Sequence, residues 1–245
     1  MECNNNAYLR NKRVLILGGS SGIGFATAQS AAAQGAQVII VSSNHQRVDA
    51  ALAQLPAGNT GYAVDLTNEQ QIKRLFETIG NFDHLVYTAG ENLQLNKISN
   101  TAVDEARSFF NLRYWGAFTA VKYASPYINV GGSITLTGGI ASPRPGSGWS
   151  LGASICAAME GFTRAMAVEL APIRVNQVSP GVVKTNLWAN MSATERDNMY
   201  MQIGNSLLVK RVGEAEDIAQ AYLYLMQQQY ATGQILVTDG GSVLV

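Results

Sequence analysis

Short apolar runs alternate along the chain with longer segments in which apolar residues recur at the helical period. The runs are apolar without interruption, which is typical of strands buried on both faces of a parallel sheet. The predicted strands are Arg13–Leu17, Gln37–Val41, Gly61–Val64, Leu85–Tyr87, Ser133–Thr137, Ile173–Val178 and Gln234–Val237. The predicted helices are Gly22–Gln34, Asn44–Leu55, Asn68–Ile79, Thr101–Tyr127, Ser150–Leu170 and Glu214–Met226. This alternation favours an α/β fold with a doubly wound parallel sheet.

The pattern runs the length of the chain without a linker, an internal repeat or a low-complexity tract. We therefore expect one Rossmann-type domain over residues 1–245, with about seven strands and helices on both faces of the sheet. The segment Trp188–Leu208 fits no strand and contains three methionines. We expect this segment to form a helical insertion or lid over the pocket, and the alternative is an ordinary surface loop.

Composition narrows the classes of function. Only 14% of the 245 residues are charged, against about 25% in an average soluble domain, which suggests that part of the surface is buried against other copies of the chain. Seventeen basic residues balance seventeen acidic ones, so no basic surplus is present to bind nucleic acid. Cys3 and Cys156 lie far apart, without disulfide or metal-ligand spacing. No targeting or membrane-spanning segment is evident, which predicts a cytoplasmic protein.

A glycine-rich turn follows the first predicted strand and precedes the first predicted helix. Glycines in this position permit a tight turn and a close approach of the backbone to a pyrophosphate, which the helix N-terminus then binds. The alternative is a turn with a structural role only. The residues that form this predicted nucleotide cradle are Gly18, Ser20, Ser21, Gly22, Ile23 and Gly24.

Motifs after the later strands extend the pattern to nearly the whole chain. They are Val64-Asp65-Leu66-Thr67, Tyr87-Thr88-Ala89-Gly90, Asn111, Val178 to Thr185, and Asp239-Gly240-Gly241. In this order they resemble the short-chain dehydrogenase/reductase family, although Leu17 and Tyr87 replace the usual Thr and Asn. The resemblance implies a dinucleotide site that includes Asp65, Leu66, Ala89, Gly90, Pro180, Gly181, Val183 and Thr185.

The residues after the second predicted strand bear on the choice of dinucleotide. A site for NAD places a carboxylate there to bind the ribose 2′-hydroxyl, and this chain has none. Hydroxyls, an amide and a nearby arginine suit a 2′-phosphate, so the sequence favours NADP(H) over NAD(H), although Arg47 could simply be solvated. The residues concerned are Ser42, Ser43, Asn44 and Arg47.

The resemblance also locates the family's proton-transfer residues, a Ser, a Tyr thirteen positions later and a Lys four beyond that. The flanking residues place these positions at Gly139, Gly152 and Cys156. Only Asn111 is retained from the family's catalytic set. Independently of any register, no tyrosine lies between Tyr127 and Tyr200. The chain is therefore predicted to lack standard carbonyl and alcohol redox chemistry.

Four side chains are candidates to replace the lost groups or to bind a ligand, and each could instead have only a packing role. The Tyr87 phenol could donate a proton or pack against the cofactor. Cys156 could be a nucleophile or a small buried residue. Arg144, between two prolines, could bind an anionic ligand or an oxyanion, and Trp149 could stack on a flat ligand, unless both belong to a stiff surface loop.

Three functions remain open at this point. The protein could bind NADP(H) without standard redox activity, or reuse the pocket as a non-redox isomerase, lyase or cyclase. It could also be an atypical NADP-dependent oxidoreductase with a relocated proton donor. The family resemblance implies a homotetramer or a homodimer assembled through the helices at Thr101–Tyr127 and Ser150–Leu170 and through the C-terminal strand.

Overall fold

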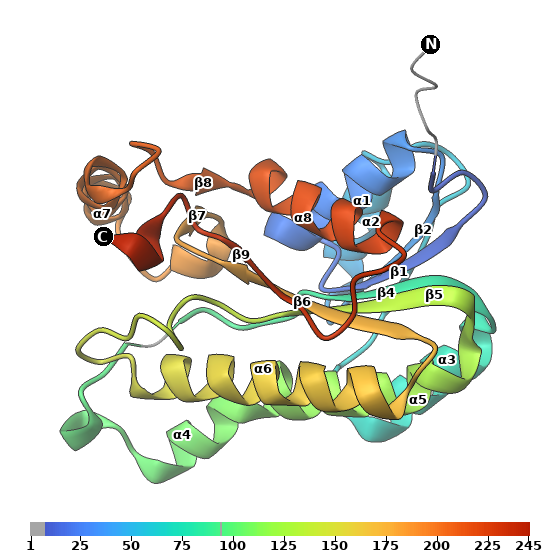
Figure 1. Ribbon diagram of the computed structural model, residues 1–245, viewed down its shortest axis with the longest axis horizontal. Helices are drawn as coiled ribbons and strands as arrows, with labels where there is room; N and C mark the ends of the chain where they lie inside the picture. Colours follow the sequence, from blue (N-terminus) through green and yellow to red (C-terminus); the bar gives the residue numbers. More distant parts are fainter. Residues whose placement is uncertain (1–7, 94) are drawn as a thin grey trace.

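Seven parallel strands form the central sheet, as the uninterrupted apolar runs predict (Figure 1). The computed structural model describes residues 8–93 and 95–245, so Cys3 lies outside the described residues. The strands are β1 (Arg13–Leu17), β2 (Gln37–Ser42), β3 (Thr60–Ala63), β4 (Phe82–Tyr87), β5 (Ile128–Thr137), β6 (Arg174–Pro180) and β9 (Ile235–Thr238). Their order, β3-β2-β1-β4-β5-β6-β9, is that of a doubly wound Rossmann-type sheet.

Helices cover both faces of the sheet (Figure 1). One layer consists of α1 (Gly22–Ala33), α2 (His45–Leu52) and α8 (Ala215–Gln227). The opposite layer consists of α3 (Glu69–Ile79), α5 (Ala117–Ala124) and α6 (Ser150–Glu169), with α4 (Val103–Phe110) beside α6. No helix among the described residues is both long and apolar enough to cross a membrane.

The residues of β1 show why the strands are apolar throughout. Successive side chains of a strand point to opposite faces of the sheet. Leu15 and Leu17 pack in the core beneath α3, α5 and α6, whereas Val14 and Ile16 pack in the core against α1 and α8. All four side chains are fully buried, because both faces of the sheet are covered.

The helix predicted over Thr101–Tyr127 is interrupted by a π-helical segment, Asn111–Gly116, between α4 and α5. The hydroxyl of Tyr87 donates a hydrogen bond of 2.5 Å to the carbonyl oxygen of Leu112. In a regular α-helix this oxygen would accept from the N–H four residues later, at Gly116. A side chain that takes a carbonyl out of the helical ladder is a recognised cause of such an irregularity.

The segment predicted as an insertion, Trp188–Leu208, begins at the last residue of a short 3₁₀ turn, Asn186–Trp188, and contains α7 (Ala193–Ser206). A capping box between Ser192 and Glu195 begins the helix. Two short strands at the ends of the segment, β7 (Val183–Lys184) and β8 (Gly213–Glu214), pair in parallel. They hold the two ends of the segment together. Each has only two residues, too few for a hydrophobic pattern to predict.

Candidate nucleotide-binding and active site

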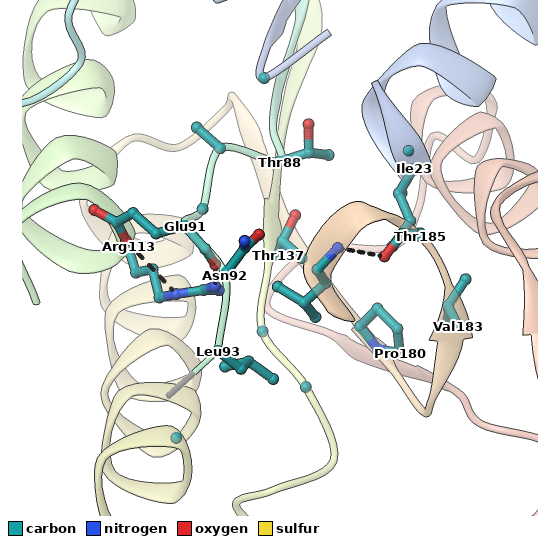
Figure 2. Close-up of a pocket in the computed structure, with 18 of the residues that line it drawn as sticks. Ile23, Thr88, Glu91, Asn92, Leu93, Arg113, Thr137, Pro180, Val183 and Thr185 are labelled. Atoms are coloured by element: carbon teal, nitrogen blue, oxygen red, sulfur yellow. Dashed lines mark hydrogen bonds and ion pairs between the residues drawn. The ribbon is translucent and has the colours of Figure 1, made fainter. Parts of the chain in front are cut away.

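A cavity of about 790 Å³ opens where β1, β4, β5 and β6 end. This is the edge at which open α/β sheets bind their ligands. Figure 2 shows Glu91, Asn92 and Arg113 on one wall and Pro180 and Thr185 on the opposite wall. The cavity is therefore enclosed by loops that follow different strands.

The structure brings the predicted nucleotide-binding residues together around this cavity, with one exception. Asn44 does not line the cavity. Its side-chain oxygen accepts a hydrogen bond of 3.0 Å from the N–H of Arg47 and caps α2, and its place in a nucleotide site stays a prediction. The predicted residues that do line it are Gly18, Ser20, Ser21, Gly22, Ile23, Gly24, Ser42, Ser43, Arg47, Asp65, Leu66, Ala89, Gly90, Pro180, Gly181, Val183 and Thr185.

The turn after β1 has the geometry of a phosphate cradle. Gly18 has a φ of +94°, and a Cβ there would lie 2.6 Å from the backbone nitrogen of Ala89. A Cβ on Gly24 would lie 2.3 Å from the carbonyl oxygen of Gly18. The N-cap residue of α1, Ser21, makes no side-chain capping bond, and the first turn carries no acidic residue. The first N–H groups and the positive end of the helix dipole are therefore available to an anion.

The far end of the cavity is lined by hydroxyls and one arginine from the segment that joins β2 to α2. Ser42 ends the strand, and Arg47 reaches back so that its Nη2 lies 3.5 Å from the Oγ of Ser43. Asp65 lies beyond them, where one carboxylate oxygen accepts hydrogen bonds of 2.9 and 2.7 Å from the backbone and hydroxyl of Thr67. These contacts fix the carboxylate at the rim.

Gly139, Gly152 and Cys156 all line the inner part of the cavity, close to one another. A Cβ on Gly139 would lie 3.2 Å from the Sγ of Cys156, and one on Gly152 would lie 3.4 Å from the Trp149 ring. Among residues 8–93 and 95–245, no tyrosine and no lysine lines the cavity. The space between these residues contains neither a phenol nor an ammonium group.

Tyr87, the candidate proton donor, and Asn111, the retained residue of the family's catalytic set, do not line the cavity. Tyr87 is buried beneath it with its hydroxyl bound to Leu112, and burial raises the pKa of this phenol well above its ordinary value. The structure places this side chain in the core, away from the cavity in which it was predicted either to donate a proton or to pack against the cofactor. Asn111 is exposed at the start of the π-helical segment, and its side chain does not line the cavity.

Cys156 is only 8% exposed, and burial raises the pKa of its thiol to about 11. The charge of Arg113 and the backbone amides of Ala141 and Ser142 act in the opposite direction but do not outweigh burial. The side chain is therefore a neutral thiol at neutral pH, and it has no thiolate character to support nucleophilic attack. Within the described part of the chain, no group of His, Cys, Asp and Glu is arranged to hold a metal ion.

The loop after β5 contributes Arg144 and Trp149 to the cavity wall. Arg144 is exposed, and its Nη1 donates a hydrogen bond of 3.3 Å to the Oγ of Ser242 near the C-terminal end. Trp149 is half-buried at the start of α6 and packs with Ile155 and Cys156. Both side chains therefore line the cavity and also contact other residues of its wall.

Sequence reasoning missed Arg113, which lines the cavity beside Glu91 (Figure 2). Its Nε lies 4.0 Å from a carboxylate oxygen of Glu91, and a terminal nitrogen donates to the backbone carbonyl of the same residue. The sequence signal that could have identified Arg113 is a charged residue between two apolar or aromatic ones, Leu112 and Tyr114. Its direction depends on the π-helical segment, which the sequence pattern did not predict.

The sheet order and the cavity above the glycine-rich turn define a Rossmann-type α/β protein. Residues 18–242 match the family model described as Enoyl-(Acyl carrier protein) reductase. The chain is 34% identical over 255 residues to the short-chain dehydrogenase/reductase ucsE of Acremonium sp, with 96% of this chain and 97% of the relative covered. It therefore belongs to the short-chain dehydrogenase/reductase family, as the motifs predicted.

Solved structures agree with this assignment. A small-chain dehydrogenase in complex with NADPH is 38% identical and superposes with a TM-score of 0.86, covering 96% of this chain and 100% of the other. The MalC Reductase/Diels-Alderase from Malbranchea aurantiaca is 32% identical with a TM-score of 0.91, covering 98% of this chain and 99% of the other. The fold is thus shared over nearly the full length.

Proposed function

We propose that this protein binds NADP(H) and lacks the Ser, Tyr and Lys proton-transfer set with which its family reduces carbonyls and oxidises alcohols. One observation carries the proposal: Gly139, Gly152 and Cys156, which the sequence motifs predict at the positions of those groups, all line the cavity. No tyrosine or lysine among the described residues lines the cavity to replace them.

The residues present fit a dinucleotide. The uncapped start of α1 suits a pyrophosphate. Gly18 packs against the backbone of Ala89, and Gly24 packs against the carbonyl of Gly18, at distances that a Cβ would prevent, so the turn stays tight. A bound nicotinamide would supply a hydride. This chain's residues would orient the ring through the segment Pro180–Thr185, but the inner part of the cavity offers no phenol for the substrate oxygen.

The missing acid has an expected cost. A positioned general acid typically contributes about a hundred- to ten-thousandfold, or roughly 3–5 kcal/mol of barrier. Because members of one catalytic unit are not additive, the loss of three groups need not exceed this range. Orientation of a substrate against the nicotinamide would leave a residual rate.

The direct test is a comparison of binding with turnover. We expect NADPH to bind, as followed by its fluorescence, while absorbance at 340 nm stays constant over a broad panel of carbonyl substrates and, with NADP⁺, of alcohols. A turnover number within about tenfold of the typical enzyme value of roughly 10 s⁻¹ would contradict the proposal. Failure of both NADPH and NADP⁺ to bind would contradict the proposal that the protein binds this dinucleotide.

The preference for NADP(H) is proposed from Ser42, Ser43 and Arg47, and a similar structure was solved with NADPH. Substitution Arg47→Ala should weaken NADPH binding about tenfold, because a charge-assisted hydrogen bond contributes about 1.5–3 kcal/mol and this side chain is exposed. NADH binding should not change. Titration calorimetry of both dinucleotides measures the difference.

The matched control for this prediction is Arg74→Ala, which removes an equally exposed arginine from α3, away from the cavity. It should leave both affinities unchanged. An equal loss for NADPH and NADH in the Arg47 variant would contradict a contact with the 2′-phosphate.

Two alternative functions use the same cavity, and each has one observation in its favour. An atypical NADP-dependent oxidoreductase is supported by Arg113 and Arg144, which could stabilise a developing oxyanion without a phenol. A non-redox isomerase, lyase or cyclase is supported by the similar MalC structure, whose name includes Diels-Alderase as well as reductase. Product analysis without consumption of NADPH separates the second alternative from the first.

The segment 188–208 is proposed as a lid. Ile203 and Ser206, near the end of α7, line the cavity together with Trp188. Asn190, at the start of the segment, accepts a hydrogen bond of 3.0 Å from the side chain of Asn92 in the loop after β4. This bond joins the segment to the opposite wall.

We also propose that the protein assembles as a homotetramer, with a homodimer as the second choice. Apolar side chains remain exposed on the helices that the family uses for contacts. Trp115 is 54% exposed, Phe118 is 40% exposed and Val168 is 81% exposed. Burial of these side chains against a second copy would remove apolar area from water and stabilise the contact.

A further inference from the structure

Arg113 occupies a site that several neighbours form around its guanidinium group. Its side chain is only 20% exposed, and its charge lies 5.3 Å from the centre of the Phe109 ring. Gly90 lies against it, since a Cβ at that position would come within 2.8 Å of Nη1. A terminal nitrogen donates to the backbone carbonyl of Glu91. The guanidinium is therefore held in place rather than free in solvent.

The hydrogen-bonding capacity of this guanidinium is not filled. Arg113 has five N–H donors, yet its buried Nε has no hydrogen-bond partner among the described residues. The carboxylate of Glu91 is 4.0 Å from Nε, too far for a hydrogen bond, and is 48% exposed. The guanidinium lines the cavity, and its one hydrogen bond to the described residues runs from a terminal nitrogen to the carbonyl of Glu91, so its other terminal N–H groups can donate to an acceptor that a ligand supplies.

The rest of this end of the cavity is mainly apolar. Leu93, Phe109 and Leu112 come from the same wall, and Trp149 and Ile155 come from the start of α6. The side chains missing at Gly139 and Gly152 leave additional room beside the Cys156 thiol. The space suits a flat apolar group with one anionic end directed at the guanidinium.

We propose that Arg113 binds an anionic oxygen, of a carboxylate or an enolate, on a planar apolar ligand that shares the cavity with the dinucleotide. The proposal extends the proposed function by assigning the substrate class of the same cavity. It also gives the cavity a fixed positive charge next to Cys156, the position where the family has its lysine. This charge comes from the π-helical segment between α4 and α5 instead of from α6.

A pair of probes that differ only in charge tests this proposal. Titration calorimetry with 2-naphthoate and with 2-naphthamide, each measured with and without saturating NADPH, should show at least tenfold tighter binding of the carboxylate. The preference should disappear in Arg113→Met and persist in Arg113→Lys, because a lysine retains the charge. Arg107→Met is the matched control, since it removes a 75% exposed arginine from α4, and it should retain the preference.

A variant that is expected to bind the carboxylate more tightly keeps the test independent of folding defects, because a misfolded protein would bind it more weakly. Glu91→Gln removes the nearby negative charge without touching the guanidinium, so it should tighten 2-naphthoate binding by about threefold and leave 2-naphthamide unchanged. A preference that survives Arg113→Met in a folded variant would overturn the proposal. So would a preference lost only in Arg144→Gln, or the failure of both probes to bind.

The two proposals fail in different ways. Loss of NADPH binding in the wild-type protein, with the carboxylate preference intact in the absence of nucleotide, would contradict the proposed function and leave the role of Arg113 in place. Normal NADPH binding without any preference for the carboxylate would overturn the role of Arg113 alone.

Discussion

Acidification from pH 6.5 to pH 4.5 should destabilise the folded protein by about 2 kcal/mol in total, because His84 is buried as a neutral imidazole. The side chain is 3% exposed at the entry of β4, and its Nδ1 lies 2.9 Å from the Oγ of Ser133. Burial lowers the pKa of His84 to about 4, and the positive charges of Arg174 and Lys12 act in the same direction. The negative charge of Asp83 opposes them but does not outweigh burial.

The sign follows from the two pKa values. In the unfolded chain the histidine has its ordinary pKa of 6.5, and in the folded chain its pKa is about 4. Between these values the unfolded chain binds a proton that the folded chain does not bind, so acid favours unfolding. The full stability is present above pH 6.5 and falls as the pH approaches 4. Asp83 has a pKa below its ordinary 3.8, so its own titration lies below this window.

Urea unfolding followed by circular dichroism at pH 7.5, 6.5, 5.5 and 4.5 measures the slope. The chain has only two histidines, which provides a matched pair of variants. His84→Gln should flatten the slope, although the lost bond to Ser133 lowers stability at pH 7.5 by about 1 kcal/mol. His45→Gln changes an exposed histidine and should keep the wild-type slope. Equal slopes in the two variants would contradict the assignment to His84.

The sheet was predictable from the sequence because its strands carry their own signal. Apolar runs buried on both faces, such as Val14 to Leu17, require helices on each side, and glycines at 18, 22 and 24 require a turn between a strand and a helix. The predicted order of elements was confirmed. The short strands β7 and β8 were not predicted, since they pair residues that are 30 positions apart in the sequence and follow no local pattern.

Part of the candidate site could also be predicted from the sequence, and part could not. Backbone-determined parts, such as the glycine turn, follow from local residue types. The direction of a side chain does not, because it depends on where its helix is irregular. Tyr87 ends a strand at the ligand edge, yet its hydroxyl binds Leu112 beneath the cavity. That contact accompanies the π-helical segment, within which Arg113 lines the cavity and Asn111 does not.

Restoring the three missing groups together should raise carbonyl reduction by at least about a hundredfold, the lower end of what a positioned general acid contributes. The variant is Gly139→Ser, Gly152→Tyr and Cys156→Lys, measured as NADPH oxidation with an aromatic aldehyde. Residues 152 and 156 lie one turn apart on α6, so a lysine at 156 would place its ammonium group beside a phenol at 152. The proximity of that charge favours the ionised phenol and lowers its pKa.

The structure shows which substitutions depend on one another. Gly139→Ser alone would bring its Cβ to 3.2 Å from the Cys156 sulfur, so it is best made with Cys156→Lys, which removes the sulfur. The Trp149 ring lies 3.4 Å from the position of a Cβ on Gly152 and would compete with a tyrosine ring for the same space. A fourth substitution, Trp149→Ala, should therefore increase the gain further.

The matched control replaces Gly152→Tyr with Gly152→Phe in the same background. The two rings have nearly the same volume, so both variants change the packing equally and differ only in the hydroxyl. A gain confined to the tyrosine variant would assign the rate to proton transfer at position 152 and show that the cavity still holds a substrate in the family's orientation. Equal rates in the two variants, with NADPH bound in both, would mean that the substrate no longer approaches α6. The anionic ligand site at Arg113 would then determine where it lies.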